Sequence, residues 1–282
     1  MRLLVTGAAG MLGRDVVAAA ESAGHDVTGL ARRDLDIADP DAVRAAARAA
    51  RPDAVVNCAA WTDVDGAEQH EADAMLINAT GAGHVAAAAP YVVQVSTDYV
   101  FDGTATTPYP EAAPLSPLGA YGRTKAAGEW AVRAEHPAPL VVRTAWLYGP
   151  GAKSFVATMA RLADERDTVD VVDDQRGQPT ATADVAAYVL TLLDADAPTG
   201  VFHATSEGET TWFGLARAVF ELLGHDPERV RPTTSAAFPH TAPRPAYSVL
   251  GHDRGAAVGA TMPPWPEALS ATLAGVLEHT RL

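Results

Sequence analysis

The chain has 282 residues and a formal charge of -14, with 48% hydrophobic and 20% charged residues. This composition is typical of a soluble globular protein that forms one large domain or two modest ones sharing a core. The acidic balance argues against non-specific binding to nucleic acid or to an anionic membrane, because both require a basic face. A ligand that carries phosphate would therefore need a local positive potential.

The N-terminal sequence MRLLVTGAAG enters an apolar segment without the charged lead and long apolar core of a signal peptide. No apolar run along the chain reaches membrane-spanning length. The single cysteine, Cys58, lies in the apolar run AVVNCAA, which favours a buried structural thiol in a reducing compartment. We therefore expect a cytoplasmic protein.

Apolar segments alternate with Ala-rich helical stretches along the first 150 residues. The predicted strands are RLLVTG, HDVTGLA, DAVVNCAA, YVVQVS and PLVVRTAW, and the predicted helices lie near residues 12–23, 40–50, 72–89 and 117–135. Strands that are apolar throughout and alternate with helices indicate a parallel sheet covered on both faces. The predicted fold class is α/β, a doubly wound parallel sheet of Rossmann type with a smaller C-terminal substrate-binding lobe.

The second half of the chain is less regular and contains the Pro-rich stretches RPTTSAAFPHTAPRPAY and TMPPWPEAL. Within it, TVDVVDD, TADVAAYVLTLLDA and VFHAT still predict a strand, a helix and a strand. We therefore expect a dinucleotide-binding domain over residues 1–145, with a return segment at about 165–203. Residues 146–164 and 204–282 would form the smaller lobe.

The first predicted strand runs into TGAAGMLG, which places Gly7, Gly10 and Gly13 at the start of a helix. Glycines at such a turn let backbone amides approach a pyrophosphate at the helix N-terminus. The GxxGxxG spacing departs from the more common GxGxxG, and a glycine-rich turn without a ligand is the alternative. Because the motif stands at the first strand-to-helix junction of a βαβ run, we favour a dinucleotide site that includes Met11 and Leu12.

The end of the second predicted strand bears on which dinucleotide binds. An acidic residue there binds the ribose 2'-hydroxyl of NAD, whereas an arginine accommodates the 2'-phosphate of NADP. The chain has Arg32 and Arg33 at this point, so we expect NADPH, with NADH as the alternative if both arginines are only solvated. Further residues expected beside the cofactor are Asp36 and Ile37 in the next loop, and Ala59 and Ala60 after the third strand.

The segment YGRTKAAGE places Lys125 four residues after Tyr121, so the two side chains share a face of the predicted helix. An ammonium beside a phenol lowers the pKa of the tyrosine and makes it a usable general acid or base, although an exposed helical pair is the alternative. The preceding strand ends at Ser96-Thr97-Asp98, so hydroxyls emerge where open α/β sheets bind ligands. Together these residues predict that Thr97 holds a carbonyl oxygen against the phenol of Tyr121.

The glycine turn followed by Thr, Tyr and Lys resembles the pattern of the extended short-chain dehydrogenase/reductase family. The similarity extends from residue 3 to about residue 250, through TGAAGMLG, VVNCAAWTDVDGAE, STDYVFDG, YGRTKAAGE, VVRTAWLYG, DDQRGQPT and RPAYSVL. Within that family, these blocks are similar to the NAD(P)-dependent reductases of dTDP-linked 4-keto sugars. The resemblance implies reduction of the C4 ketone of dTDP-4-dehydro-β-L-rhamnose to dTDP-L-rhamnose, with hydride from NADPH and a proton from Tyr121.

By the same resemblance, Thr97 orients the keto oxygen, and Lys125 holds the nicotinamide ribose and tunes Tyr121. The implied substrate-binding residues are Thr62, Val64, Thr97, Trp146, Gln175, Arg176, Gln178 and Arg244. Arg176 and Arg244 are the candidates for the diphosphate, while a core position is the alternative for Trp146. The only partners expected are a nucleotide-sugar substrate and a second copy in a homodimer. No metal is expected, because none of the nine histidines shows the spacing of metal ligands.

Two other functions stay open from the sequence. A nucleotide-sugar 4-epimerase of the same superfamily would hold its NAD tightly and would not release the oxidised cofactor after each turnover. A dehydratase of that superfamily places Asp-Glu after the Thr, and the Asp98-Tyr99 found here lacks this carboxylate pair. A non-catalytic dinucleotide-binding subunit, similar to the regulatory subunit of methionine adenosyltransferase, would bind NADPH without oxidising it.

Overall fold

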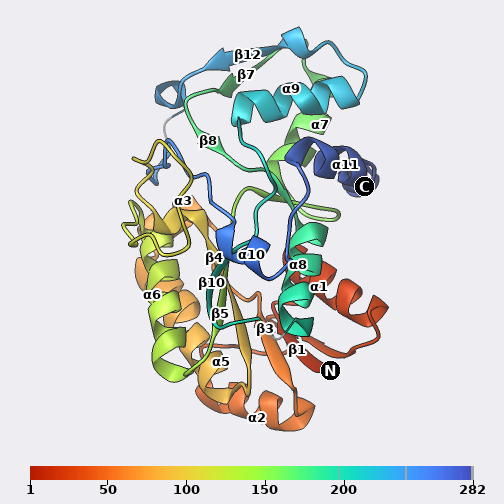
Figure 1. The fold of residues 1–282 in the computed structure, drawn as a ribbon. Helices are drawn as coiled ribbons and strands as arrows, with labels where there is room; N and C mark the ends of the chain where they lie inside the picture. Colours follow the sequence, from red (N-terminus) through yellow and green to blue (C-terminus); the bar gives the residue numbers. More distant parts are fainter. Residues whose placement is uncertain (196, 239, 281–282) are drawn as a thin grey trace.

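The main sheet of the computed structural model, which describes residues 1–195, 197–238 and 240–280, has six parallel strands (Figure 1). They are β1 (Arg2–Thr6), β2 (Asp26–Leu30), β3 (Ala54–Asn57), β4 (Val92–Thr97), β5 (Leu140–Thr144) and β10 (Gly200–His203). Their order is β10-β5-β4-β3-β1-β2, so the direction of winding reverses between β1 and β3. The prediction of a doubly wound parallel sheet is confirmed. Such a reversal leaves a crevice at the carboxyl ends of the strands.

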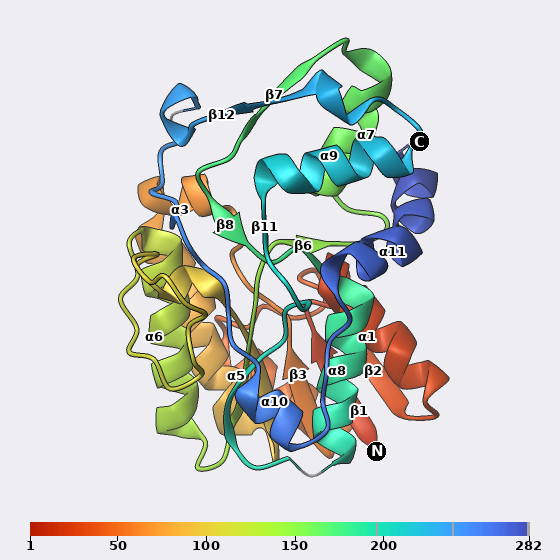
Figure 2. The same cartoon turned by 45° about the horizontal axis from the view of Figure 1, so that its top comes forward.

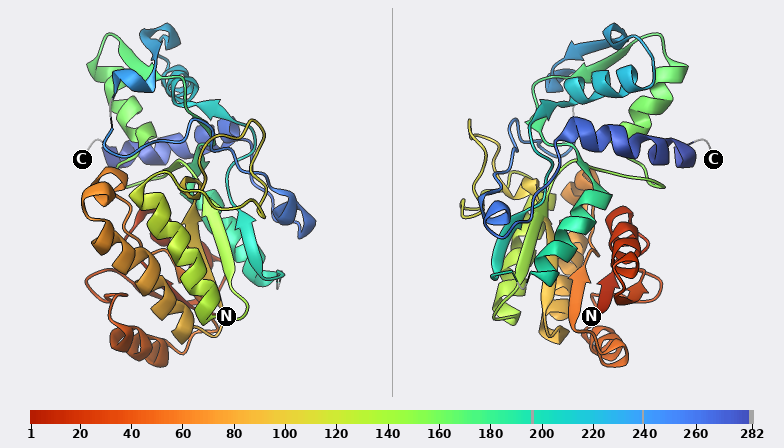
Figure 3. Two further views of the ribbon diagram at one scale, coloured as in Figure 1. Left: turned by 90° about the vertical axis from the view of Figure 1, so that its left-hand side faces the viewer. Right: turned by 45° about the vertical axis from the view of Figure 1, so that its right-hand side comes forward.

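Helices cover both faces of this sheet, and nearly all residues of its inner strands are therefore buried (Figure 3). On one face lie α1 (Met11–Ser22) and α8 (Thr182–Asp194), whose Val16 and Val185 pack on the strands. On the other lie α2 (Pro40–Ala50), α5 (Ala82–Ala88) and α6 (Ala120–Glu135). Within the described ranges, no helix is both long enough and apolar enough to cross a membrane.

The chain from residue 71 to residue 88 differs from the single helix predicted over 72–89. It consists of α4 (Glu71–Met75), the π-helix η1 (Leu76–Gly81) and then α5. A π-helical turn is wider than an α-helical one and is often found at functional sites. Apolar periodicity does not reveal this change of helix type, because apolar residues recur at nearly the same helical spacing in all three segments.

A smaller lobe lies over the carboxyl edge of the sheet (Figure 2). Its helices α7 (Phe155–Glu165), α9 (Trp212–Leu222) and α11 (Trp265–Thr280) pack around a second apolar core. The paired strands of this region are β6 (Leu147–Tyr148) with β9 (Thr180–Ala181), β7 (Val169–Val172) with β12 (Val230–Thr233), and β8 (Arg176–Gly177) with β11 (Thr210–Thr211). The remaining short helices are α3 (Val64–Gln69), η2 (Asp98–Val100), η3 (Pro227–Arg229), η4 (Ser235–Ala237) and α10 (Asp253–Ala257).

Only part of the predicted return segment at 165–203 lies against the main sheet. Helix α8 packs on α1 and β10 pairs with β5, whereas β7 pairs with β12 in the smaller lobe. An apolar run predicts a strand but not the strand with which it pairs. The division of the chain into two domains at the predicted boundaries stays a prediction.

Candidate functional site

A cavity of about 700 Å³ lies at the crevice where the sheet reverses its direction of winding. Its lining comes from the turn after β1, the ends of β3, β4 and β5, and the first turns of α6. All lining residues fall between Gly7 and Leu147, although the smaller lobe lies above this edge. The cavity therefore sits where open α/β sheets bind their ligands.

The glycine turn forms one end of this cavity and requires glycine for two separate reasons. Gly7 has φ of 68°, and a Cβ atom there would lie 2.7 Å from the Ala59 backbone nitrogen. A Cβ atom on Gly13 would lie 2.2 Å from the Gly7 carbonyl oxygen. Gly10 caps α1 without any side-chain acceptor in the described chain, so the first amides of this helix can receive an anion. The turn fits the pyrophosphate of a dinucleotide.

The two arginines after β2 have different surroundings. Arg32 lines the cavity, and no ion pair or hydrogen bond of its guanidinium is found within the described part of the chain. The side chain of Arg33 is 89% exposed, lies 3.6 Å from Asp34 and does not line the cavity. Of these two arginines, Arg32 lies at the cavity and Arg33 does not. The other expected cofactor residues, Met11, Leu12, Asp36, Ile37, Ala59 and Ala60, all line the cavity.

Thr97, Tyr121 and Lys125 converge at the other end of the cavity. Thr97 is the last residue of β4, and its hydroxyl donates to Asp98 Oδ1 at 3.0 Å and accepts from the Tyr99 amide at 3.2 Å. Tyr121 stands in the first turn of α6, edge-on to Tyr99 with 5.6 Å between ring centroids. The end of β4 and the start of α6 thus bring the Thr97 hydroxyl and the Tyr121 phenol close together.

The phenol of Tyr121 is protonated at neutral pH in this environment. Burial raises the pKa of Tyr121, the hydrogen bond with Thr97 lowers it in part, and Asp98 raises it further. The prediction of a lowered pKa is wrong for this structure, because burial has the largest effect on the phenol and the Lys125 ammonium is not among the groups that shift it. Lys125 Nζ donates to the Val95 carbonyl oxygen at 2.7 Å. A protonated phenol can act as an acid toward a reduced carbonyl oxygen.

Lys125 is buried, and burial lowers its pKa to about 8 against the raising effects of Glu129 and Cys58. Cys58 lies in the lining of the cavity. Burial of its side chain raises the pKa of the thiol to about 12. A thiol with such a pKa is unreactive at neutral pH. The expected structural role of Cys58 agrees with this environment.

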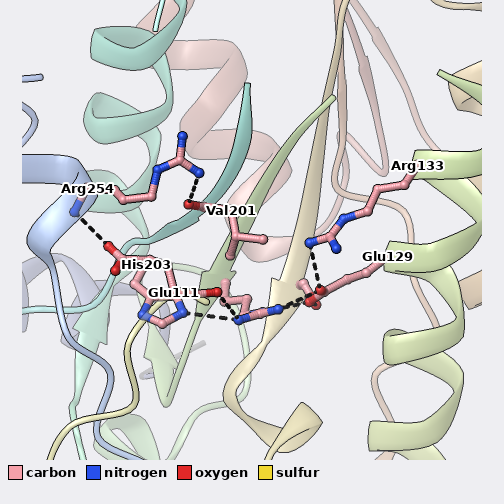
Figure 4. Close-up of polar contacts among 8 residues, drawn as sticks. Glu111, Glu129, Arg133, Val201, His203 and Arg254 are labelled. Atoms are coloured by element: carbon pink, nitrogen blue, oxygen red, sulfur yellow. Dashed lines mark hydrogen bonds and ion pairs between the residues drawn. The ribbon is translucent and has the colours of Figure 1, made fainter. Parts of the chain in front are cut away.

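A buried ion pair joins α6 to β5 (Figure 4). Arg143 on β5 donates from Nε and Nη2 to the two carboxylate oxygens of Glu129 on α6, at 2.8 Å each, and both side chains are almost fully buried. Ser96 donates to Glu129 Oε1 at 2.7 Å, and Arg133 approaches Oε2 to 3.9 Å. This carboxylate therefore joins α6 to β4 and β5 beside Thr97 and one helical turn after Lys125.

His203 on β10 completes the shell around Arg143 (Figure 4). Burial and the neighbouring Arg143 lower the pKa of His203 to about 3, so its imidazole is neutral. Its Nδ1 lies 2.8 Å from the Gly251 carbonyl, which can only accept, so the proton is on Nδ1 and Nε2 is free to accept from Arg143 at 3.4 Å. Arg143 also donates to the Glu111 carbonyl at 3.3 Å. The histidine satisfies the buried guanidinium without adding charge.

Asn78 in the π-helix η1 holds the chain after β3 against α6. Its Oδ1 accepts from the Trp61 amide at 2.8 Å, and its Nδ2 donates to the Trp61 carbonyl at 3.1 Å and to Thr124 Oγ1 at 3.0 Å. Trp61 lines the cavity beside Thr62. Asn78 thereby fixes one side of the cavity, a role the sequence did not indicate.

The predicted substrate residues divide into two groups. Thr62, Val64, Thr97 and Trp146 line the cavity, while Gln175, Arg176, Gln178 and Arg244 do not. Gln178 is buried in the interior, where Oε1 accepts from Thr205 and from the Leu250 amide, and Nε2 donates to the Ser206 and Leu250 carbonyls. With all four of its hydrogen bonds made inside the protein, Gln178 is not brought to the cavity.

Both arginines expected at the diphosphate are paired with carboxylates. Arg176 donates to Glu209 at 2.9 Å, and Arg244 donates to Asp65 at 2.7 Å while lying 5.8 Å from the centre of the Tyr99 ring. Tyr99 lines the cavity, so Arg244 stands just outside its edge. The diphosphate role of the two arginines stays a prediction.

Sequence reasoning missed several residues that line the cavity. They are Ala9, Leu35, Trp61, Ile77, Val95, Asp98, Tyr99, Thr144, Ala145 and Leu147. The residues around 95–99 and 144–147 directly follow or end central strands, and this position alone could have indicated them. Burial raises the pKa of Asp98 to about 6. Among the described residues, no group of three or more His, Cys, Asp or Glu side chains could hold a metal ion.

Comparison with known proteins gives a consistent result over almost the full chain. Residues 1–277 match the family model described as RmlD substrate binding domain. The chain is 52% identical to a dTDP-4-dehydrorhamnose reductase of Streptomyces griseus, with 92% of this chain and 88% of the relative covered. It is 51% identical to a dTDP-4-keto-6-deoxy-D-glucose reductase of Streptomyces niveus, with 92% of each covered. The crystal structure of a dTDP-4-dehydrorhamnose reductase from Bacillus anthracis in complex with NADP superposes with a TM-score of 0.93 at 35% identity, covering 97% of this chain and 98% of that one.

Proposed function

Because the chain belongs to the RmlD substrate binding domain family, we propose that it is an NADPH-dependent dTDP-4-dehydrorhamnose reductase. It reduces the C4 ketone of dTDP-4-dehydro-β-L-rhamnose to the alcohol of dTDP-L-rhamnose. The observation that carries this proposal is the convergence of Thr97, Tyr121 and Lys125 with the glycine turn in one cavity.

The residues have complementary parts in this reduction. Bound NADPH supplies a hydride to C4 of the sugar, and the electron pair of the C=O π bond moves to the oxygen. Tyr121 gives its phenolic proton to that oxygen, and the Thr97 hydroxyl, which donates to Asp98 in this structure, would turn to donate to the oxygen instead. Lys125 places a positive charge beside the ribose, and solvent restores the proton of the phenol after product release. The net reaction consumes one hydride and one proton.

An NADPH absorbance assay with the purified protein tests the proposed function. We expect oxidation of NADPH with dTDP-4-dehydro-β-L-rhamnose and release of NADP(+) after every turnover. An epimerase would hold its dinucleotide, and a non-catalytic subunit would bind NADPH without consuming it. The absence of turnover with this sugar and with dTDP-4-keto-6-deoxy-D-glucose would exclude the reductase. Turnover with the second sugar alone would show that the chain shares the substrate named for the relative of Streptomyces niveus.

Arg32 is expected to set the preference for NADPH. Arg32→Ala should raise KM for NADPH about 10–100-fold and leave KM for NADH within about twofold, because only the 2'-phosphate loses a charged hydrogen bond. Initial-rate kinetics with both cofactors measures this. Arg33→Ala is the matched control, since its side chain is 89% exposed outside the cavity. An equal effect of both substitutions would contradict the assignment.

The charge of Lys125 should produce an alkaline decline in the use of NADPH. The pKa of Lys125 is lowered to about 8, so the ammonium is present below that pH and is lost above it. We expect kcat/KM for NADPH to fall as the pH rises through about 8. Lys125→Arg should abolish this decline, because a guanidinium stays charged, and yet lower activity, because its reach and geometry differ. A decline that persists in Lys125→Arg would assign it to another group.

Two further expectations belong to the same proposal. We expect a homodimer, and light scattering of the purified protein measures this directly. We also expect the enzyme to work in the cytoplasm, where its NADPH is supplied, and fractionation of cells that produce it tests this.

A further inference from the structure

Trp146 has an unusual backbone conformation in the lining of the cavity. It stands between β5 and β6 with φ of 47°, in the left-handed region that a bulky side chain rarely adopts. Arg51, the other such non-glycine residue in the described chain, simply ends helix α2. A strained residue persists only where its surroundings hold it, and such residues gather at ligand sites.

Trp212 from the smaller lobe lies flat against Trp146. The ring centroids are 3.6 Å apart and the planes differ by 8°, which is a full face-to-face stack. Phe155 packs on Trp212 at 4.7 Å, and Gly177 makes room for the Trp146 ring, since a Cβ atom there would lie 2.5 Å from Cε2. Trp146 lines the cavity, whereas Trp212 does not.

The orientation of Trp212 is itself fixed by hydrogen bonds. Its Nε1 donates to Gln175 Oε1 at 3.1 Å. Trp212 is the first residue of α9, whose cap Thr211 accepts from the Gly214 amide at 3.1 Å and donates to Asp173 at 2.6 Å. The indole is therefore held at its polar edge and at its backbone.

We propose that Trp212 is a positioning residue, which keeps the Trp146 indole in place so that the smaller lobe sets the shape of the sugar end of the cavity. The flat apolar face of Trp146 suits the C–H face and the methyl group of a 6-deoxy sugar. The identity of that ligand rests on the proposed function, but the stacked pair does not. Gln175 then acts on the substrate through Trp212 and not by direct contact.

Circular dichroism and kinetics of a Trp212→Leu variant test this role. Two stacked indoles whose transition dipoles are rotated relative to each other give an exciton couplet, and we expect the wild-type near-UV signal of this pair to be lost in Trp212→Leu. KM for the 4-keto sugar nucleotide should rise about tenfold, while KM for NADPH stays within about twofold. Trp130→Leu is the matched control, because Trp130 is 57% exposed on α6 and should change neither quantity.

Trp212→Phe keeps an aromatic ring at this position and decides the outcome if Trp212→Leu does not fold. We expect it to restore most of the affinity for the sugar nucleotide without restoring the couplet. An unchanged KM for the 4-keto sugar nucleotide in Trp212→Leu would overturn the positioning role. So would a folded Trp212→Phe variant whose KM for that substrate is raised as much as is expected for Trp212→Leu. A crystal structure of the protein alone in which the two indoles do not stack would disprove the stack even if the proposed reaction is correct. A stacked pair in a protein without any turnover would instead disprove the proposed reaction.

Discussion

Tyr121→Phe is expected to lower kcat for ketone reduction about 10²–10⁴-fold, the usual contribution of a positioned general acid. The phenylalanine keeps the ring that packs edge-on against Tyr99 and removes only the proton donor. The pKa of Tyr121 is raised by burial, so the phenol is protonated throughout the neutral range and the loss should not vary with pH there. Single-turnover oxidation of NADPH measures the loss of rate. Steady-state kinetics should show that KM for NADPH is unchanged.

Tyr99→Phe is the matched control, since Tyr99 lines the same cavity and touches Tyr121. We expect its kcat to stay within about tenfold of the wild type. If Tyr121→Phe keeps most of its activity, Asp98 is the next candidate donor. The pKa of Asp98 is raised to about 6, so it holds a proton below that pH and loses it above. The rate would then fall as the pH rises through about 6.

Glu129→Gln is expected to destabilise the protein by about 3–5 kcal/mol, because it leaves the Arg143 cation buried without its counter-charge. Urea unfolding measures this as a lower transition midpoint with an unchanged slope. The pair Glu71–Arg123 is the matched control, with the same two-point geometry at 2.7 and 2.8 Å but with both side chains about 40% exposed. Glu71→Gln should cost less than about 1 kcal/mol.

The double variant Glu129→Gln with Arg143→Met separates the charge from the packing. Removing both charges of a buried pair is often nearly neutral, so we expect it to recover most of the lost stability. A double variant as unstable as Glu129→Gln would mean that the hydrogen bond from Ser96 and the guanidinium contacts around Arg143, and not the unpaired charge, carry the effect.

The local parts of this site could be predicted from the sequence. The glycine turn and the Tyr121–Lys125 spacing are each contained within a few residues, and the ends of apolar strands mark the edge where they meet. The strand order confirmed this reasoning, since it places the turn and Thr97 at one crevice.

The parts that the sequence did not reveal depend on contacts between distant residues. Lys125 was expected to act on a phenol four residues away, but its ammonium meets the Val95 carbonyl on a separate strand. Gln178 lies in a block shared with the reductases, and yet its amide is used by Thr205 and Leu250 in the interior. A motif shows that a residue matters, and only the fold shows whether it faces ligand or protein.

The π-helix from Leu76 to Gly81 bears on how the length of this chain can change during evolution. A π-helical turn contains one more residue than the α-helical turn it replaces, so a single deletion between residues 71 and 88 would be accommodated as ordinary helix. Such a deletion leaves α4 and α5 in register, whereas a change that displaces Asn78 itself would break its hydrogen bonds to Trp61 and Thr124. Homologous enzymes that keep this activity should therefore differ in length by at most one residue here and should keep the asparagine.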